Sequence, residues 1–139
     1  MSYMLLIAEP VGQRAERSQA EGKLLYESMV EFGAGLKERG LLIASESLAS
    51  GGVRIKKRDG QASLIDGPFA EAREMVAGFS IWEVKDMDEA VAWAKRCPML
   101  PGTMEIRPFY EVADLADFVT PEELAAGGRE GERGKLGVA

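Results

Sequence analysis

Two segments of the chain are apolar at almost every position, and this pattern is typical of strands that are covered on both faces. They span residues 3–8 and 76–84, and the second is interrupted by Ser80 and Glu83. A strand that is covered on both faces lies inside a sheet rather than at its edge. The two segments are therefore predicted to be the central strands of one sheet.

A long helix is predicted after the first of these strands. Ser18 and Glu21 have the spacing of a capping box, and Gly40 ends the helical pattern. Between them, apolar residues recur at spacings of three and four and form one buried stripe: Leu25, Met29, Phe32 and Leu36. Gly33 and Gly35 each destabilise a helix by roughly 1 kcal/mol relative to Ala, so they predict close packing of another backbone segment there.

The rest of the pattern predicts four shorter strands and a second helix. The strands are expected over residues 41–48, 53–58, 62–65 and 104–112. The Asp-Gly pair at 59–60 is a strong signal for a two-residue hairpin turn between the second and third of them. Asp86 is the N-terminal cap of a helix that is expected over residues 87–96.

In chain order these elements are strand, helix, strand, hairpin, strand, helix and strand. This is the split βαβ arrangement of an α+β ferredoxin-like fold, βαββαβ, with an inserted β-hairpin. Two helices can cover one face of such a sheet, whereas its two central strands are apolar on both faces. We therefore expect a homodimer in which the sheets of two copies pack face to face.

The length of 139 residues fits one folded domain. The pattern of strands and helices ends near residue 113, so the domain is expected to span residues 1–113. Residues 114–139 are expected to form a C-terminal extension. It begins with a short helix that is capped by Thr120 and starts at Pro121, and a tail with little order is expected from Gly127 onward.

The net charge of −6 and the pI near 4.8 disfavour binding to nucleic acid or to an anionic membrane surface. The basic cluster of the chain is expected on the solvated hairpin and consists of Arg54, Lys56, Lys57 and Arg58. No apolar run approaches the roughly 20 residues of a membrane span, and residues 1–10 lack the pattern of a secretory signal. The expected location is the cytoplasm.

The sequence contains no histidine, which excludes imidazole catalysis and histidine-ligated zinc within the chain. We expect neither a metal nor a cofactor, because no metal-ligand spacing and no glycine-rich phosphate loop is present. Cys97 is expected to be a packing residue with a raised pKa, because the C-terminal end of a helix disfavours the thiolate. Acid–base chemistry would fall to one of four carboxylates: Asp66, Glu46, Glu71 or Glu105.

Three short segments carry a resemblance to a known family. They are Asp66-Gly67-Pro68-Phe69 with the charged run that follows it, Gly78-Phe79-Ser80-Ile81-Trp82, and Glu105-Ile106-Arg107-Pro108. Together they closely resemble the YCII-related family, in the branch that is called DGPF-domain proteins after the first tetrapeptide. The resemblance spans about residues 3–112 and implies a dimeric α+β barrel.

The resemblance also implies a ligand cavity near the edge of the dimer's sheet. The residues that it implies to line or shape this cavity are Asp66, Gly67, Pro68, Phe69, Glu71 and Glu74. Arg73 stands where many relatives have Lys, and it is predicted to contact the ligand together with Arg54 and Arg107. A guanidinium keeps the positive charge of a lysine, but it does not provide the amine chemistry.

Three functional hypotheses follow. The first is a regulatory homodimer that binds a small polar or anionic molecule beside the Asp66 loop without turnover. The second is a cofactor-free lyase, isomerase or dehalogenase of aromatic or hydroxylated acids, by fold analogy, with Asp66 as the acid or base. The third is an interaction module whose apolar sheet face binds a different protein.

Overall fold

The structure is a computed structural model, and it describes residues 1–66, 73–99 and 101–126. The chain divides into two compact units, Met1–Pro108 and Phe109–Ala139, which are described separately. Among the described helices, none is both long enough and apolar enough to cross a membrane.

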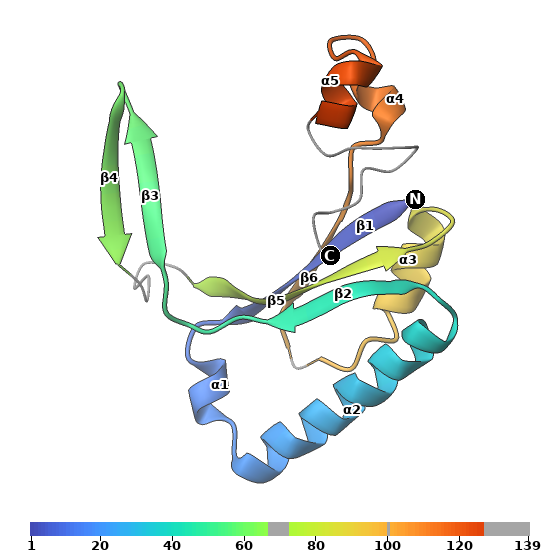
Figure 1. Ribbon diagram of the computed structural model, residues 1–139. Coiled ribbons are helices and arrows are strands. Elements are labelled where there is room, and N and C mark those ends of the chain that lie inside the picture. Colours follow the sequence, from blue (N-terminus) through green and yellow to red (C-terminus); the bar gives the residue numbers. More distant parts are fainter. Residues whose placement is uncertain (67–72, 100, 127–139) are drawn as a thin grey trace. The chain divides into compact units, whose positions relative to one another are not determined.

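A four-stranded antiparallel sheet forms the centre of the first unit (Figure 1). Its strands are β1 (Ser2–Pro10), β2 (Leu42–Ser47), β5 (Glu74–Glu83) and β6 (Thr103–Pro108), and their order across the sheet is β2-β5-β1-β6. This order places β1 and β5 in the middle, which confirms the prediction from their two-sided apolar pattern. The α+β topology is that of a ferredoxin-like fold.

The described residues of this unit form three helices: α1 (Gln13–Glu16), α2 (Gln19–Glu38) and α3 (Met87–Ala94). The predicted caps are present, since Ser18 Oγ accepts a hydrogen bond from the Glu21 amide at 3.1 Å and Asp86 Oδ1 accepts one from the Glu89 amide at 2.9 Å. The sequence pattern did not predict α1. Gly12, with a φ of +88°, precedes it in the left-handed conformation that glycine adopts without strain.

Strands β3 (Val53–Arg58) and β4 (Gln61–Asp66) form a two-stranded sheet of their own. Asp59 and Gly60 both have positive φ, at 51° and 75°, as the predicted two-residue turn requires. The hairpin therefore forms where the Asp-Gly pair predicted it.

The hydrophobic core lies between the sheet and helices α2 and α3, which cover the same face (Figure 1). Its buried members are Tyr3, Leu5, Leu36, Trp82, Val84, Ala90 and Trp93. The indole N–H of Trp82 donates to Ser80 Oγ at 2.7 Å, so the largest core side chain has no unsatisfied donor. Both tryptophans are core residues.

The last strand is shorter than predicted. It ends at Pro108, which has no amide N–H to donate to a strand ladder, so the expected strand over residues 104–112 is wrong beyond this position.

In the second unit, Val112–Leu115 forms α4 and Pro121–Ala126 forms α5. The predicted cap of α5 is confirmed, because Thr120 Oγ1 accepts a hydrogen bond from the Glu123 amide at 3.2 Å.

Replacement of Leu36 by Ala tests how α2 is held on the sheet. Leu36 is 1% exposed, so we expect Leu36→Ala to lower the free energy of unfolding by about 2–5 kcal/mol in urea titrations. Leu24, on the same helix, is 65% exposed, and Leu24→Ala should change the stability by less than about 0.5 kcal/mol. Equal losses in the two variants would contradict this assignment of the core.

Candidate functional site

The helix-facing side of the sheet changes from large to small side chains along two neighbouring strands. Val84, just after the end of β5, and Trp82 within it are followed toward the start of the strand by Ser80 and Gly78. On β2, Leu42 pairs with Trp82, whereas the two serines of this strand pair with Ser80 and Gly78. These two strands therefore provide large packing partners at one end of α2 and almost no side-chain volume at the other.

Helix α2 follows this change. Near its C-terminal end, the ring of Phe32 lies 5.9 Å from that of Trp82 and 6.3 Å from that of Trp93. Nearer its N-terminal end, Leu25 and Met29 of the predicted buried stripe are half-buried. The stripe is thus confirmed as the inner side of α2, but close packing on the sheet occurs at one end of the helix.

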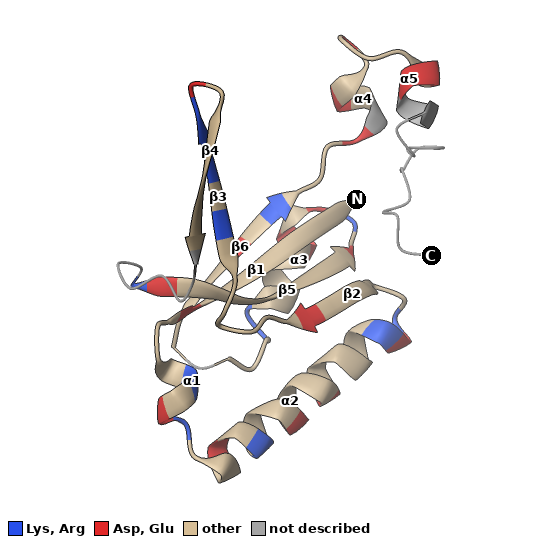
Figure 2. Ribbon diagram, turned by 60° about the vertical axis from the view of Figure 1, so that its left-hand side comes forward, with Lys and Arg blue, Asp and Glu red and all other residues tan. Residues whose placement is uncertain are grey.

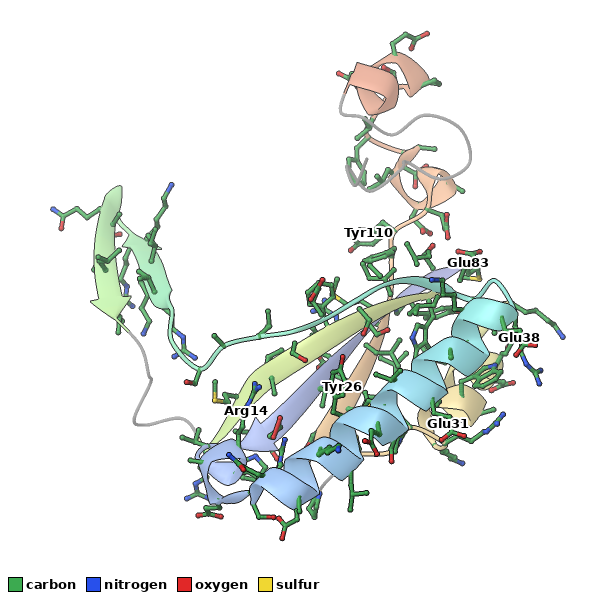
Figure 3. The ribbon with its side chains drawn as sticks, turned by 60° about the horizontal axis from the view of Figure 1, so that its bottom comes forward. Arg14, Tyr26, Glu31, Glu38, Glu83 and Tyr110 are labelled. Carbon is green, nitrogen blue, oxygen red and sulfur yellow. The ribbon has the colours of Figure 1, made fainter. Side chains whose placement is uncertain are left out.

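A cavity of about 710 Å³ separates the N-terminal half of α2 from the sheet. This volume is within the range of small-molecule sites and is far larger than a packing defect. Apolar walls come from Ile7, Leu25, Met29, Val30 and Met99. In Figure 3, Arg14 and Tyr26 mark the α1 and α2 walls, seen with the side chains drawn.

Two glycines keep the cavity open. A Cβ atom on Gly78 would lie 2.9 Å from the carbonyl oxygen of Glu46, which leaves no room for a side chain on this part of the floor. On the opposite wall, no described atom lies within 4 Å of a Cβ built on Gly33, and the same holds for Gly35. The prediction that these two helical glycines allow close backbone packing is therefore wrong, and Gly33 borders open space.

The polar end of the cavity is built by the loop that enters α2. Arg17 Nη2 lies 3.0 Å from Glu9 Oε2, and both side chains are largely buried, with 12% and 21% exposure. Gln13 Nε2 donates to the carbonyl of Pro101 at 2.9 Å, and this bond fixes the orientation of the Gln13 amide. The end of β1 and the turn after it thus bring three polar side chains to one end of an apolar cavity.

Two buried polar atoms at this end have no hydrogen-bond partner among the described residues: Gln13 Oε1 and Arg17 Nε. One is an acceptor and the other a donor. Leaving a buried polar atom unpaired costs about 1–3 kcal/mol, so each atom favours a bound group that satisfies it. The arrangement can recognise a polar group while the apolar walls contact the remainder of a ligand.

Comparison with known protein families matches the YCII-related domain to residues 1–113. The chain belongs to the YCII-related family. The match spans the four-stranded sheet, the hairpin and the cavity residues, and it confirms the family that the three sequence segments indicated. None of the curated proteins that were searched matches the chain. Membership in the DGPF branch stays a prediction.

The predicted site of this YCII-related chain lies largely outside the cavity. Gly67, Pro68, Phe69 and Glu71 lie outside the described residues. Asp66 is the last residue of β4, and its side chain also lies outside the described part, so its role as an acid or base stays a prediction. The cavity lining in the described part of the chain includes none of the predicted contact residues.

The other predicted contacts come from separate places. Arg54 is exposed on β3 of the hairpin, and Arg107 is exposed on the outer strand β6. Arg73 and Glu74 are exposed where β5 begins, and the carbonyl of Arg73 accepts a hydrogen bond from the Val11 amide at 3.0 Å. The chain therefore enters β5 beside the loop that carries Gln13 and Arg17, which brings the predicted and the observed sites close at this point.

A second, smaller hollow of the YCII-related unit lies beside the C-terminal half of α2. It has a volume of about 390 Å³ and is bordered by Trp93 and Phe32. The guanidinium carbons of Arg39 and Arg96 lie 5.1 and 4.5 Å from the centre of the Trp93 ring, within the range of cation–π contacts. These arginines shield the core tryptophan from solvent.

Cys97 provides a test of burial next to the cavity. Burial raises the pKa of its thiol from 9.0 to about 11, and its Sγ lies 3.9 Å from Met29 Sδ. At pH 8 the thiolate population should be roughly 100-fold lower in the folded protein than in urea. The rate of alkylation by iodoacetamide should fall by the same factor, because the thiolate is the form that reacts. In the folded protein this rate should rise as the pH is raised toward 11. Equal rates in the two states would contradict the burial of this thiol.

Proposed function

We propose that this protein is a homodimer that binds a small, uncharged polar molecule in the cavity between α2 and the sheet. The observation that carries the proposal is the pair of unpartnered buried atoms, Arg17 Nε and Gln13 Oε1, at one end of a cavity with apolar walls. A binding role without turnover fits this site, and a regulatory setting is compatible with it.

The charge of the site supports an uncharged ligand group. Arg17 is already paired with Glu9, so a carboxylate ligand would approach a guanidinium whose charge is offset and would meet the acceptor oxygen of Gln13. A hydroxyl or primary amide both accepts and donates, so it satisfies Arg17 Nε and Gln13 Oε1 together. The geometry thus favours the polar over the anionic form of the predicted ligand.

The described carboxylates of the cavity favour binding over catalysis. Glu9 is held by Arg17, and Glu46 is exposed on the outer strand β2. A general acid or base requires a carboxylate with a pKa near the working pH, and burial without a cationic partner is the usual cause of such a shift. Glu105 is likewise exposed, on β6, so the enzymatic hypothesis depends on Asp66 or Glu71.

A thermal-shift panel of matched alcohols, primary amides and carboxylates tests this proposal. We expect alcohols or amides that fit the cavity to raise the melting temperature by several degrees. At a ligand concentration 100-fold above Kd, binding stabilises the folded state by about 2.7 kcal/mol. Carboxylates should raise the melting temperature less. Stabilisation by carboxylates alone, or by none of the compounds, would count against the proposal.

Two glycine variants locate the binding site. Gly33→Leu places a side chain in the cavity and should abolish the ligand-induced shift, because the added atoms occupy the volume of the ligand. Gly35→Leu is the matched control, since Gly35 borders the smaller hollow instead. Both variants gain a similar helix propensity, so a loss of binding in Gly33→Leu alone assigns the ligand to this cavity.

The homodimer is supported by the sheet face that α2 and α3 do not cover. Strand register places two rows of residues across this face: Glu46, Phe79, Leu6 and Glu105 in one row, and Ala44, Ile81, Met4 and Arg107 in the next. The central strands contribute apolar side chains, and the outer strands contribute mostly charged ones. An apolar centre between charged edges is the composition of a protein interface.

Leu6→Glu tests the dimer, because it places a carboxylate in the middle of the apolar centre. We expect the protein to sediment as a dimer and the variant to sediment as a monomer with an unchanged circular dichroism spectrum. Leu24→Glu introduces the same charge on the exposed surface of α2 and should remain dimeric. A monomeric unmodified protein would disprove the dimer but would leave the proposed ligand site unaffected.

A further inference from the structure

The charged side chains that line the cavity in the described part of the chain are Glu9, Arg14, Arg17 and Glu46. Arg14 and Glu46 are exposed, so water and salt screen their charges. They come from α1 and from the outer strand β2, where Figure 2 marks charged positions. Glu9 and Arg17 are largely buried and are screened much less. A ligand in the cavity therefore meets mainly the charges of these two residues.

The turn after β1 brings the two buried charges together. Glu9 lies near the end of β1, and Arg17 directly follows α1. Gly12, with its positive φ, reverses the chain between them, so that Arg17 Nη2 donates to Glu9 Oε2 at 3.0 Å. Arg17 Nε remains without a partner among the described residues. The guanidinium thus binds a carboxylate of its own chain through one nitrogen and retains a donor at another.

The sum of these two charges decides which ligand charge the site favours. A buried charge without a partner is costly, so a lone guanidinium favours an anion and a lone carboxylate favours a cation. The Glu9–Arg17 pair is neutral as a whole. An ion beside this pair loses its hydration without gaining an uncompensated opposite charge, whereas an uncharged group has less hydration to lose.

We propose that Glu9 is the specificity-determining residue of the cavity: by neutralising Arg17, it makes the site select an uncharged group over an anion of the same shape. The inference rests on the ligand site proposed above and deepens it, because it assigns the charge preference to one ion pair. Glu9 acts through Arg17 and does not have to touch the ligand. Removal of either charge of the pair should turn the cavity into a site for the opposite charge.

Three probes of nearly the same shape measure this preference. Benzamide is uncharged at neutral pH, benzoate carries a negative charge and benzamidine carries a positive charge. Their dissociation constants are measured by calorimetric titration of the full-length protein. We expect the unmodified protein to bind benzamide at least tenfold more tightly than either ion.

Two substitutions remove the charges of the pair one at a time. Glu9→Gln removes the negative charge, while the new amide oxygen can still accept the hydrogen bond from Arg17. We expect it to lower the dissociation constant of benzoate at least tenfold, because the guanidinium charge is then uncompensated. Arg17→Gln should lower that of benzamidine by a similar factor. Gln13 is unchanged in both variants, so the shifts report the charge.

Glu16→Gln is the matched control. Glu16 is an exposed residue of α1, directly before Arg17 in the sequence, and it does not line the cavity. Its substitution changes the net charge of the chain by the same amount as Glu9→Gln. We expect each dissociation constant to change less than threefold, because an exposed charge is screened by solvent. Equal effects of the two substitutions would show that net charge, rather than the buried pair, sets the preference.

Urea titrations establish that the variants fold. If Glu9→Gln does not fold, Arg17→Gln carries the test, since its predicted shift has the opposite sign. The inference is overturned if benzoate binds folded Glu9→Gln no better than the unmodified protein, or if benzamidine gains nothing from Arg17→Gln. If the unmodified protein binds none of the probes but Glu9→Gln binds benzoate, the role of Glu9 stands and the proposed uncharged ligand is wrong. If no probe binds any of these proteins, both fail.

Discussion

The packing of Phe32 and Leu36 into the core that contains Trp82 and Trp93 is the constraint on which the rest of the first unit depends. It fixes the C-terminal half of α2 on the sheet, while the N-terminal half faces Gly78 and the serines of β2, which have too little volume to fill the space below it. A straight helix of about 30 Å cannot approach both ends of such a surface equally. The cavity is thus a consequence of the size gradient along β2 and β5.

The same gradient separates the packed core from the cavity. The large side chains that stabilise the fold lie at one end of the sheet, and the polar groups of Arg17, Glu9 and Gln13 lie at the other. Because the cavity contributes little packing, substitutions in its lining are expected to have a small effect on folding.

Local patterns predicted most elements, because caps, the Asp-Gly turn and two-sided apolar strands are determined by neighbouring residues. Helix α1 was missed because four residues cannot show helical periodicity. The cavity was missed for a different reason: it depends on the register that places Gly78 between Ile7 and Ser47, and such long-range pairing is not visible in a single sequence. The Arg17–Glu9 pair likewise depends on the turn at Gly12.

Native-state hydrogen exchange along α2 is the most direct test of one-ended packing. One-ended packing predicts that amides over residues 22–29 exchange through local opening at a much lower free energy than amides over residues 32–38. Gly33→Leu fills the space below the helix and should reduce this difference in free energy. Uniform protection along the whole helix would show that both halves of α2 pack on the sheet. It would contradict the claim that the cavity arises from close packing at one end of the helix only.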